Sequence, residues 1–231
     1  METSGQVRRL VAERGHDVIS CDLLPADDGG SPGRHIQGDV FETLEGLRVS
    51  GWWPDRALFH PDCTFHTNAA AWAFGDGPYH QQVKPGTAVG RERRERRERS
   101  RADVDRIATL KIARIIVENP IGSLHQVRTI GKPSQIVQPY ELGDDASKAT
   151  CFWYLGEDWM LMQPLGIPID PSMRVAGRLV EWPRGSGEMV ERWVNQTDSG
   201  QNRLSPGDDR WKERSGTYPG IAKGLADLLC K

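Results

Sequence analysis

Cys63 is the residue whose position in this sequence most strongly suggests covalent chemistry. It stands in the stretch RALFHPDCTFHTNAA, residues 56–70, where a short apolar run meets a proline, an acid and then the cysteine. Structural cysteines usually lie among aliphatic residues, whereas a cysteine on a loop after a strand is typical of a reactive thiol. Glu118 ends a second apolar run, ARIIVENP, in the same way. We expect both side chains to face a substrate.

Small or acidic residues follow the other predicted strands. Gly5 would end strand one, Asp22 strand two and Asp39 strand three, ahead of Cys63 and Glu118. Ligands of open α/β sheets bind past the carboxyl ends of the strands, so this row predicts a nucleoside-bearing cofactor at Gly5, Asp22 and Asp39. Taken singly, each acid is better explained as a helix N-cap or a solvated loop residue. The ordered series favours the cofactor site.

The elements that must position these residues alternate between strand and helix. Apolar spacing predicts helices at 5–15, 91–112 and 220–229, and strands at 16–25, 55–61, 113–120, 135–142 and 149–156. The segment 36–47 predicts a very short strand and then a helix, and 157–210 predicts irregular structure. This alternation is typical of a doubly wound α/β sheet. No room remains for a strand ahead of Gly5, so we expect the first strand to be missing and the sheet to have a gap or a rearrangement there.

The composition excludes several functional classes. The 231 residues carry a formal net charge of −2, so any attraction to nucleic acid must come from local patches. The four cysteines are widely spaced and form no CxxC pair, and we find neither a signal peptide nor an apolar run of the roughly 20 residues that span a membrane. These features predict a cytosolic protein with reduced thiols, in the host cytoplasm if a phage encodes it.

The order of these motifs resembles the cytosine-5 DNA methyltransferases, in the compact form found in phage-type genomes. ETSGQVR resembles their glycine motif, CDLLP the ribose-binding acid motif and GDV the adenine-contacting motif. HPDCT resembles the Pro-Cys nucleophile loop, and VENP the Glu-Asn-Val motif. YELGDDASKATCFWYLG and the terminal RSGTYPGIAKGLADLL resemble later motifs.

The resemblance implies a Rossmann-like fold and S-adenosylmethionine as cofactor. It divides the chain into a catalytic domain at 1–156, a short substrate-recognition insert at 157–192 and a closing segment at 193–231. The cofactor-binding residues that it implies are Ser4, Gly5, Asp22, Leu23, Asp39, Val40 and Pro61. The catalytic residues that it implies are Cys63, Glu118, Asn119 and Lys148.

The implied reaction explains these residue types. Carbon 5 of cytosine is a poor nucleophile until a thiolate, here from Cys63, adds to carbon 6. A carboxylic acid, here Glu118, drives that addition by donating a proton to ring nitrogen 3. Asp62 stands where the family has proline, and its charge would oppose thiolate formation. Lys148 is the one cation left of the family's arginine motif.

DNA is the expected partner, with two candidate contact regions. The run 91–101 holds seven Arg and three Glu, so Arg94, Arg97 and Arg101 could contact phosphates, or the helix could be solvated and self-paired. Gln201 and Asn202 lie in a polar stretch that is either a base-facing loop or plain surface.

Two alternative interpretations remain open at this stage, and a third, a metal site, is disfavoured. A free pyrimidine nucleotide could replace DNA as substrate, because the recognition insert is short. The chain could also be a non-catalytic nucleic-acid-binding remnant. The spacing of His60, Cys63 and His66 suits a metal, but zinc normally needs a fourth ligand and no second close pair exists, so we expect no metal.

Overall fold

The chain folds into two compact units of mixed α/β structure. The computed structural model describes residues 3–80, 82–161, 165–204 and 216–231. One unit, here the Cys63 unit, combines Pro54–Ile136 with Thr150–Leu165. The other, here the Asp22 unit, combines Met1–Trp53, Val137–Ala149 and Gly166–Lys231. The prediction of a mixed α/β protein is confirmed.

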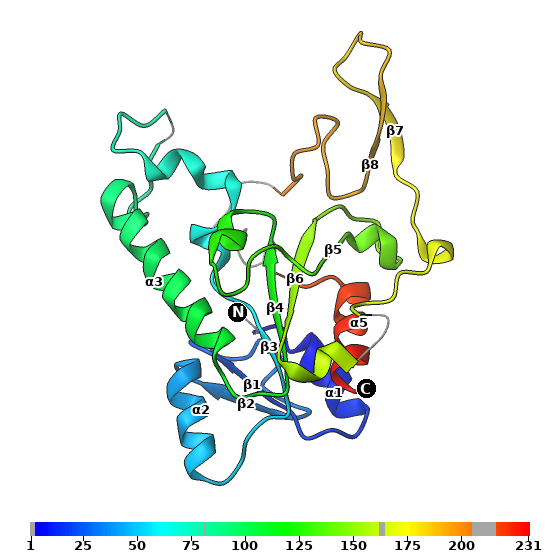
Figure 1. Cartoon of the computed structure of the whole chain (residues 1–231). Coiled ribbons are helices and arrows are strands. Elements are labelled where there is room, and N and C mark those ends of the chain that lie inside the picture. Colours follow the sequence, from blue (N-terminus) through cyan, green and yellow to red (C-terminus); the bar gives the residue numbers. More distant parts are fainter. Residues whose placement is uncertain (1–2, 81, 162–164, 205–215) are drawn as a thin grey trace. The chain divides into compact units, whose positions relative to one another are not determined.

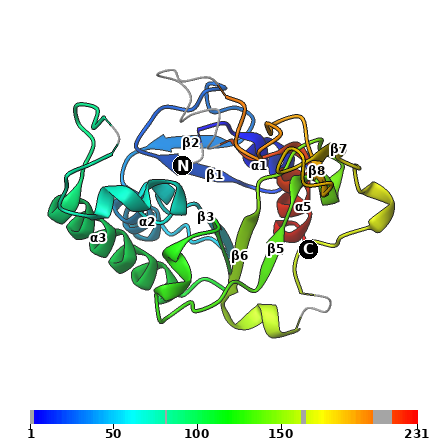
Figure 2. The same cartoon turned by 90° about the horizontal axis from the view of Figure 1, so that it is seen from above.

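The Cys63 unit is built on a sheet with the strand order β3-β4-β6-β5. Strand β3 (Arg56–Phe59) runs parallel to β4 (Arg114–Pro120), and β6 (Thr150–Leu155) runs antiparallel to β4. Strand β5 (Gln135–Val137) neighbours β6, but it ends five residues before the predicted end at 142, because the proline at 139 begins the 3-10 turn η4 (Pro139–Leu142). Nearly every residue of β6 is buried, which explains its continuous apolar run. Figure 2 shows β3, β6 and β5 from above.

Helix α3 (Gly90–Ala108) joins β3 to β4 after two 3-10 turns, η1 (Cys63–Phe65) and η2 (Asn68–Phe74). Its apolar positions lie only in the second half, where Val104 and Ile107 are buried. The first half packs against η1 and η2 instead. Two further 3-10 turns, η3 (Ser123–Gln126) and η5 (Glu157–Leu161), follow β4 and β6. The long predicted helix is therefore confirmed, ending four residues earlier than its pattern suggested.

The Asp22 unit begins with α1 (Gln6–Glu13), β1 (Ile19–Asp22), β2 (Arg34–Gln37) and α2 (Val40–Val49). Strands β1 and β2 form a parallel pair. The amphipathic helix α5 (Pro219–Leu229) packs against α1, as Figures 1 and 2 show. Both helices bury apolar residues, and Arg14 of α1 forms an ion pair with Asp227 of α5.

A second part of the Asp22 unit corrects the prediction of irregular structure at 157–210. Strands β7 (Arg178–Glu181) and β8 (Met189–Arg192) form an antiparallel hairpin, preceded by the 3-10 turns η4 (Pro139–Leu142) and η6 (Pro171–Met173). Each hairpin strand has only four residues and is charged at one or both ends. Such short segments lack the sustained alternation that identifies a strand in a sequence.

The described strands form three separate sheets rather than one. From residue 3 onward no strand precedes Gly5, and each of β1 and β3 has one strand neighbour. A single doubly wound sheet therefore stays a prediction. Within the described ranges, no helix is long and apolar enough to cross a membrane.

Candidate active site

Cys63 begins a short 3-10 turn just past the end of β3. The Asp62 side chain caps this turn by accepting a hydrogen bond from the Thr64 backbone at 2.8 Å. The Cys63 carbonyl accepts from the backbone N–H groups of His66 and Thr67 at 3.0 and 3.1 Å. The thiol-bearing residue is half-buried. The structure thus places Cys63 on a loop after a strand, as predicted, and the hydrogen bonds of the turn fix its backbone.

Two hydrogen bonds tie the loop before Cys63 to the end of β4. The parallel register pairs Phe59 with Val117, so the next residues, His60 and Glu118, come level. His60 Nδ1 lies 2.9 Å from Glu118 Oε2, and both side chains are mostly buried. Asn119 Nδ2 donates to the Pro61 carbonyl at 2.8 Å.

Both hydrogen bonds end within three residues of Cys63, so the loop that carries Cys63 is fixed to Glu118 and Asn119. Sequence reasoning treated His60 only as a rival metal ligand. Its position one residue after β3, level with Glu118, is the feature that could have indicated this contact with Glu118.

The second cysteine of this unit, Cys151, is a structural thiol. It lies on β6 directly opposite Asn119 and is buried. Burial and, to a smaller extent, the charge of Glu118 raise the pKa of the Cys151 thiol to about 11. Cys151 therefore stays protonated near neutral pH, and Cys63 is the more accessible thiol of the unit.

His66 connects the Cys63 turn to two other segments. Its Nε2 lies 2.9 Å from Ser100 Oγ on α3, and its Nδ1 lies 3.4 Å from Ser123 Oγ on η3. The side chain is buried, and burial lowers the pKa of His66 to about 4, with the charge of Arg101 acting in the same direction. A neutral histidine thus supports the turn that carries Cys63.

No family model, curated protein or solved structure matches this chain. The roles of its residues therefore rest on the chemistry and geometry described here. Among the described residues, no group of three His, Cys, Asp or Glu side chains is placed to hold a metal ion. The ring of His60 contacts Glu118, and the ring of His66 contacts the two serines.

The three arginines predicted to contact phosphate interact with the protein itself. Arg94 donates to the Phe74 carbonyl at 2.6 Å, and the Arg97 guanidinium lies 4.2 Å from the centre of the Phe74 ring. Arg101 forms an ion pair with Glu98 at 2.9 Å. Arg94 and Arg97 thus attach α3 to η2, and Arg101 pairs within the helix.

On the outer face of α3, charged residues pair along the helix. Arg91 bonds to Glu95 at 2.7 Å and Arg96 to Glu92 at 2.6 Å, both at a spacing of four residues. Such pairs are the self-paired alternative that the sequence left open.

The predicted cofactor residues, except Pro61, lie in the Asp22 unit. Gly5 caps α1 with a φ of 64°, a left-handed conformation that favours glycine. A Cβ at Gly5 would lie 2.1 Å from Asp28 Oδ2, so no side chain fits there. The neighbouring Ser4 accepts from the Gln6 backbone at 3.4 Å and, through its carbonyl, from Arg9 at 2.9 Å.

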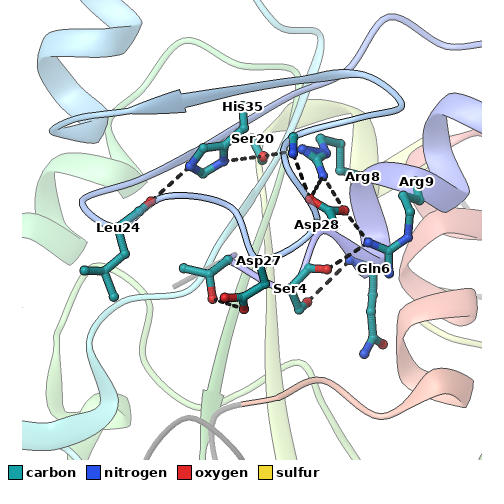
Figure 3. A network of polar contacts seen from close by, with 11 residues as sticks. Ser4, Gln6, Arg8, Arg9, Ser20, Leu24, Asp27, Asp28 and His35 are labelled. Carbon is teal, nitrogen blue, oxygen red and sulfur yellow. Dashed lines mark hydrogen bonds and ion pairs between the residues drawn. The ribbon is translucent and has the colours of Figure 1, made fainter.

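Asp28 bonds to two arginines of the helix that follows this glycine turn, as Figure 3 shows. Its carboxylate bonds to Arg8 at 2.5 and 2.6 Å and also to Arg9. Arg8 is almost fully buried, and its hydrogen bond holds the pKa of Asp28 far below its usual range. Sequence reasoning missed this pair. Arg8 stands between Val7 and Val11 on the buried side of α1, which is an unusual place for a charge unless it is paired.

The two predicted acids after β1 and β2 have different environments. Asp22 is buried and accepts from the Leu24 backbone at 3.0 Å, beside Leu23, whose side chain is 70% exposed. Asp39 is exposed and caps α2 by accepting from the backbone of its second and third residues at 2.8 and 3.1 Å, which places the half-buried Val40 first in the helix. The N-cap explanation of Asp39 is therefore correct, whether or not it also contacts a cofactor.

The remaining predicted residues stand on the loops of the Asp22 unit. Lys148 Nζ donates to the Gly216 carbonyl at 3.0 Å. Because Lys148 lies in the Asp22 unit, the four predicted catalytic residues are divided between the two units. The Gln201 carbonyl accepts from the Thr197 backbone at 2.8 Å, and the Gln201 N–H donates to Thr197 Oγ1 at 3.1 Å. Asn202 Oδ1 accepts from the Leu204 backbone at 2.8 Å. Gln201 is exposed and Asn202 is half-buried.

Proposed function

We propose that this chain transfers a methyl group from S-adenosylmethionine to carbon 5 of cytosine in DNA. The observation that best supports the proposal is the double tether between the loop 60–61 and the residues Glu118 and Asn119. It sets a half-exposed cysteine three residues from a histidine that bonds to a mostly buried carboxyl group. Addition to a pyrimidine ring requires a nucleophile and an acid, and here the nucleophile follows one strand while the acid lies on the neighbouring parallel strand.

In this proposal Cys63 and Glu118 act together on the base. The Cys63 thiolate forms a bond to carbon 6 while Glu118 gives its proton to ring nitrogen 3, so the ring becomes an enamine that is nucleophilic at carbon 5. After methyl transfer, a base removes the proton from carbon 5, the bond between sulfur and carbon 6 breaks, and nitrogen 3 returns its proton. His60 orients the Glu118 carboxyl throughout, since its ring nitrogen fixes Oε2.

The residues at the ends of β1 and α1 fit such a cofactor in chemical type. Asp22 offers carboxylate oxygens that ribose hydroxyls can donate to, and the exposed Leu23 offers an apolar surface beside it. Gly5 supplies the left-handed turn that begins α1, and the Asp28 carboxylate fills the space where its side chain would lie. When bound, S-adenosylmethionine would supply an electrophilic methyl group on its sulfonium centre, which would leave as a neutral thioether that keeps the electron pair of the broken bond.

A mechanism-based trap tests this proposal directly. DNA containing 5-fluorocytosine cannot lose its carbon 5 substituent, so the bond between Cys63 and carbon 6 should persist after methyl transfer as a covalent adduct. We expect the wild type to form this adduct in the presence of S-adenosylmethionine and Cys63→Ser to form none. Cys151→Ser is the matched control, because it removes the buried thiol of the same unit and should leave the adduct intact.

Glu118→Gln provides the second arm of the test. Glutamine keeps the size of the side chain but has no acidic proton, so methylation should slow by about 10²–10³-fold. Mass spectrometry of nucleosides from treated DNA would measure the product, 5-methylcytosine. The proposal fails if folded wild-type protein yields neither the adduct nor the product, or if Cys63→Ser retains both.

A further inference from the structure

The β7–β8 hairpin and the loop that follows it line a shallow, open groove of about 410 Å³. This volume lies within the range of small-ligand sites, roughly 300–1,000 Å³. Figure 1 shows the hairpin and the loop side by side, and contacts between Arg192 and Asp198 confirm it. The residues that line the groove are Trp182, Arg184, Thr197, Asp198, Ser199 and Arg203.

The groove has a defined framework. Arg178 on β7 bonds to the Asp198 carboxylate at 2.7 Å, and Arg192 on β8 donates to the Asp198 carbonyl at 3.0 Å. Gly200 has a φ of 81°, and a Cβ there would lie 3.3 Å from Arg192 Cζ. The left-handed φ favours glycine at this position, and the nearby Arg192 guanidinium leaves little room for a side chain.

Positive charge exceeds negative charge around this groove. Asp198 has the single carboxylate among the residues that line the groove, and four arginines lie around this residue: Arg178 and Arg192, which bond to it, and Arg184 and Arg203, which line the groove. The pKa of Asp198 is lowered first by the bond from Arg178 and then also by the charges of Arg184 and Arg203. Two carboxylates of the hairpin bond to groups that do not line the groove. Glu191 pairs with Arg174, and Glu181 accepts from the Gly187 backbone at 2.7 Å. The groove therefore presents guanidinium groups that an anionic ligand could neutralise.

We propose that this groove binds one nucleotide of a single-stranded stretch of DNA. Trp182 is half-buried at the groove wall and, within the described residues, its ring stacks on no other aromatic ring. Its indole face provides a surface on which a base can stack. Arg184 and Arg203, both exposed, bind the adjacent phosphate groups, and the hydroxyls of Thr197 and Ser199 complete the polar lining.

The combination of groups favours a nucleotide over an acidic peptide. Arginines alone would bind any anion, but an indole beside them matches a ligand with a flat ring and a phosphate. The inference deepens the proposed function, since DNA is the substrate there, yet it depends on different residues. None of the groove residues is among those assigned to methyl transfer.

Binding of a fluorescent single-stranded oligonucleotide of 15 thymidines to the full chain, followed by anisotropy without S-adenosylmethionine, tests the inference. We expect Trp182→Ala to weaken binding about tenfold and Trp182→Phe, which keeps a stacking face, to weaken it much less. Arg184→Gln with Arg203→Gln should lower the slope of log Kd against log salt concentration by about 1.4, the value expected for two lost phosphate contacts on a single strand.

A charge-matched double variant of the same unit, Arg48→Gln with Lys223→Gln on α2 and α5, should leave the slope nearly unchanged. Equal binding by the wild type, Trp182→Ala and the Arg184/Arg203 double variant would overturn the inference. Equal affinity for a polyglutamate peptide would overturn it too, since the groove would then be a general anion site. Because Cys63→Ser should bind the oligonucleotide normally, failure of methyl transfer and failure of the groove can be told apart.

Discussion

At the scale of single residues, burial converts His66 from a titratable group into a structural one. Its pKa is about 4 in the folded protein and about 6.5 in the unfolded chain, so the unfolded state takes up a proton first as the pH falls. The stability that depends on neutral His66 is thus complete above pH 6.5 and is lost between pH 6.5 and 4. We expect urea unfolding to show a loss of roughly 3 kcal/mol across this window.

His66→Gln identifies the source of that loss. Glutamine can still bond to Ser100 but does not titrate, so the variant should lose less stability than the wild type between pH 6.5 and 4. His16→Gln, at an exposed position, is the control and should behave like the wild type. An unchanged pH profile in His66→Gln would show that another group causes the loss.

The residues of the candidate site differ in how far a sequence can predict them. Cys63 and Glu118 each follow an apolar run, so their positions past strand ends could be predicted from the sequence. The hydrogen bond from His60 to Glu118 could not, because it depends on the register in which β3 meets β4. The bonds between Arg8, Arg9 and Asp28 likewise join segments about 20 residues apart, and nothing local marks them.

At the scale of elements, α3 is held by charged side chains where other helices use apolar ones. Arg93 is buried, donates to the Ala88 carbonyl at 3.3 Å and to the Thr64 carbonyl, and lies 4.8 Å from the centre of the Phe74 ring. Arg93→Ala would remove these contacts and leave two carbonyls without this donor. We expect a loss of about 2–4 kcal/mol in the free energy of unfolding.

Arg99 on the same helix is the matched control. It is exposed and forms no ion pair among the described residues, so Arg99→Ala should change stability by less than about 0.5 kcal/mol. Denaturant unfolding of both variants measures the difference. Similar values for the two would mean that the buried position of Arg93 contributes little to stability.

Periodicity predicted the helices better than the hairpin. The second half of α3 and the whole of α5 have apolar residues at helical spacing, and both helices form where the pattern placed them. The strands β7 and β8 are stabilised by pairing with each other and by the contacts of Arg192 and Arg178 with Asp198. Four-residue strands that depend on such distant partners leave no clear period in the sequence.

At the scale of the whole molecule, the sequence predicted the class of the fold but not how its sheets divide. Each parallel pair, β1 with β2 and β3 with β4, agrees with the predicted alternation of strands and helices. Their separation into different sheets depends on which strands find neighbours over long stretches of chain, and local pattern does not determine that. The same division puts the predicted cofactor residues, except Pro61, in one unit and Cys63 in the other.

This division predicts that cofactor binding and nucleophilic attack can be impaired separately. Asp22→Asn keeps the oxygen that accepts from the Leu24 backbone but loses the charge that strengthens a bond to ribose hydroxyls. We expect S-adenosylmethionine affinity, measured by calorimetry, to fall about tenfold in Asp22→Asn, with little change in melting temperature.

Cys63→Ser should bind the cofactor within about twofold of the wild type, because Cys63 lies in the other unit. Asp17→Asn, an exposed acid just before β1, controls for the loss of one negative charge. If Asp22→Asn and Asp17→Asn bind the cofactor equally well, Asp22 does not contact it.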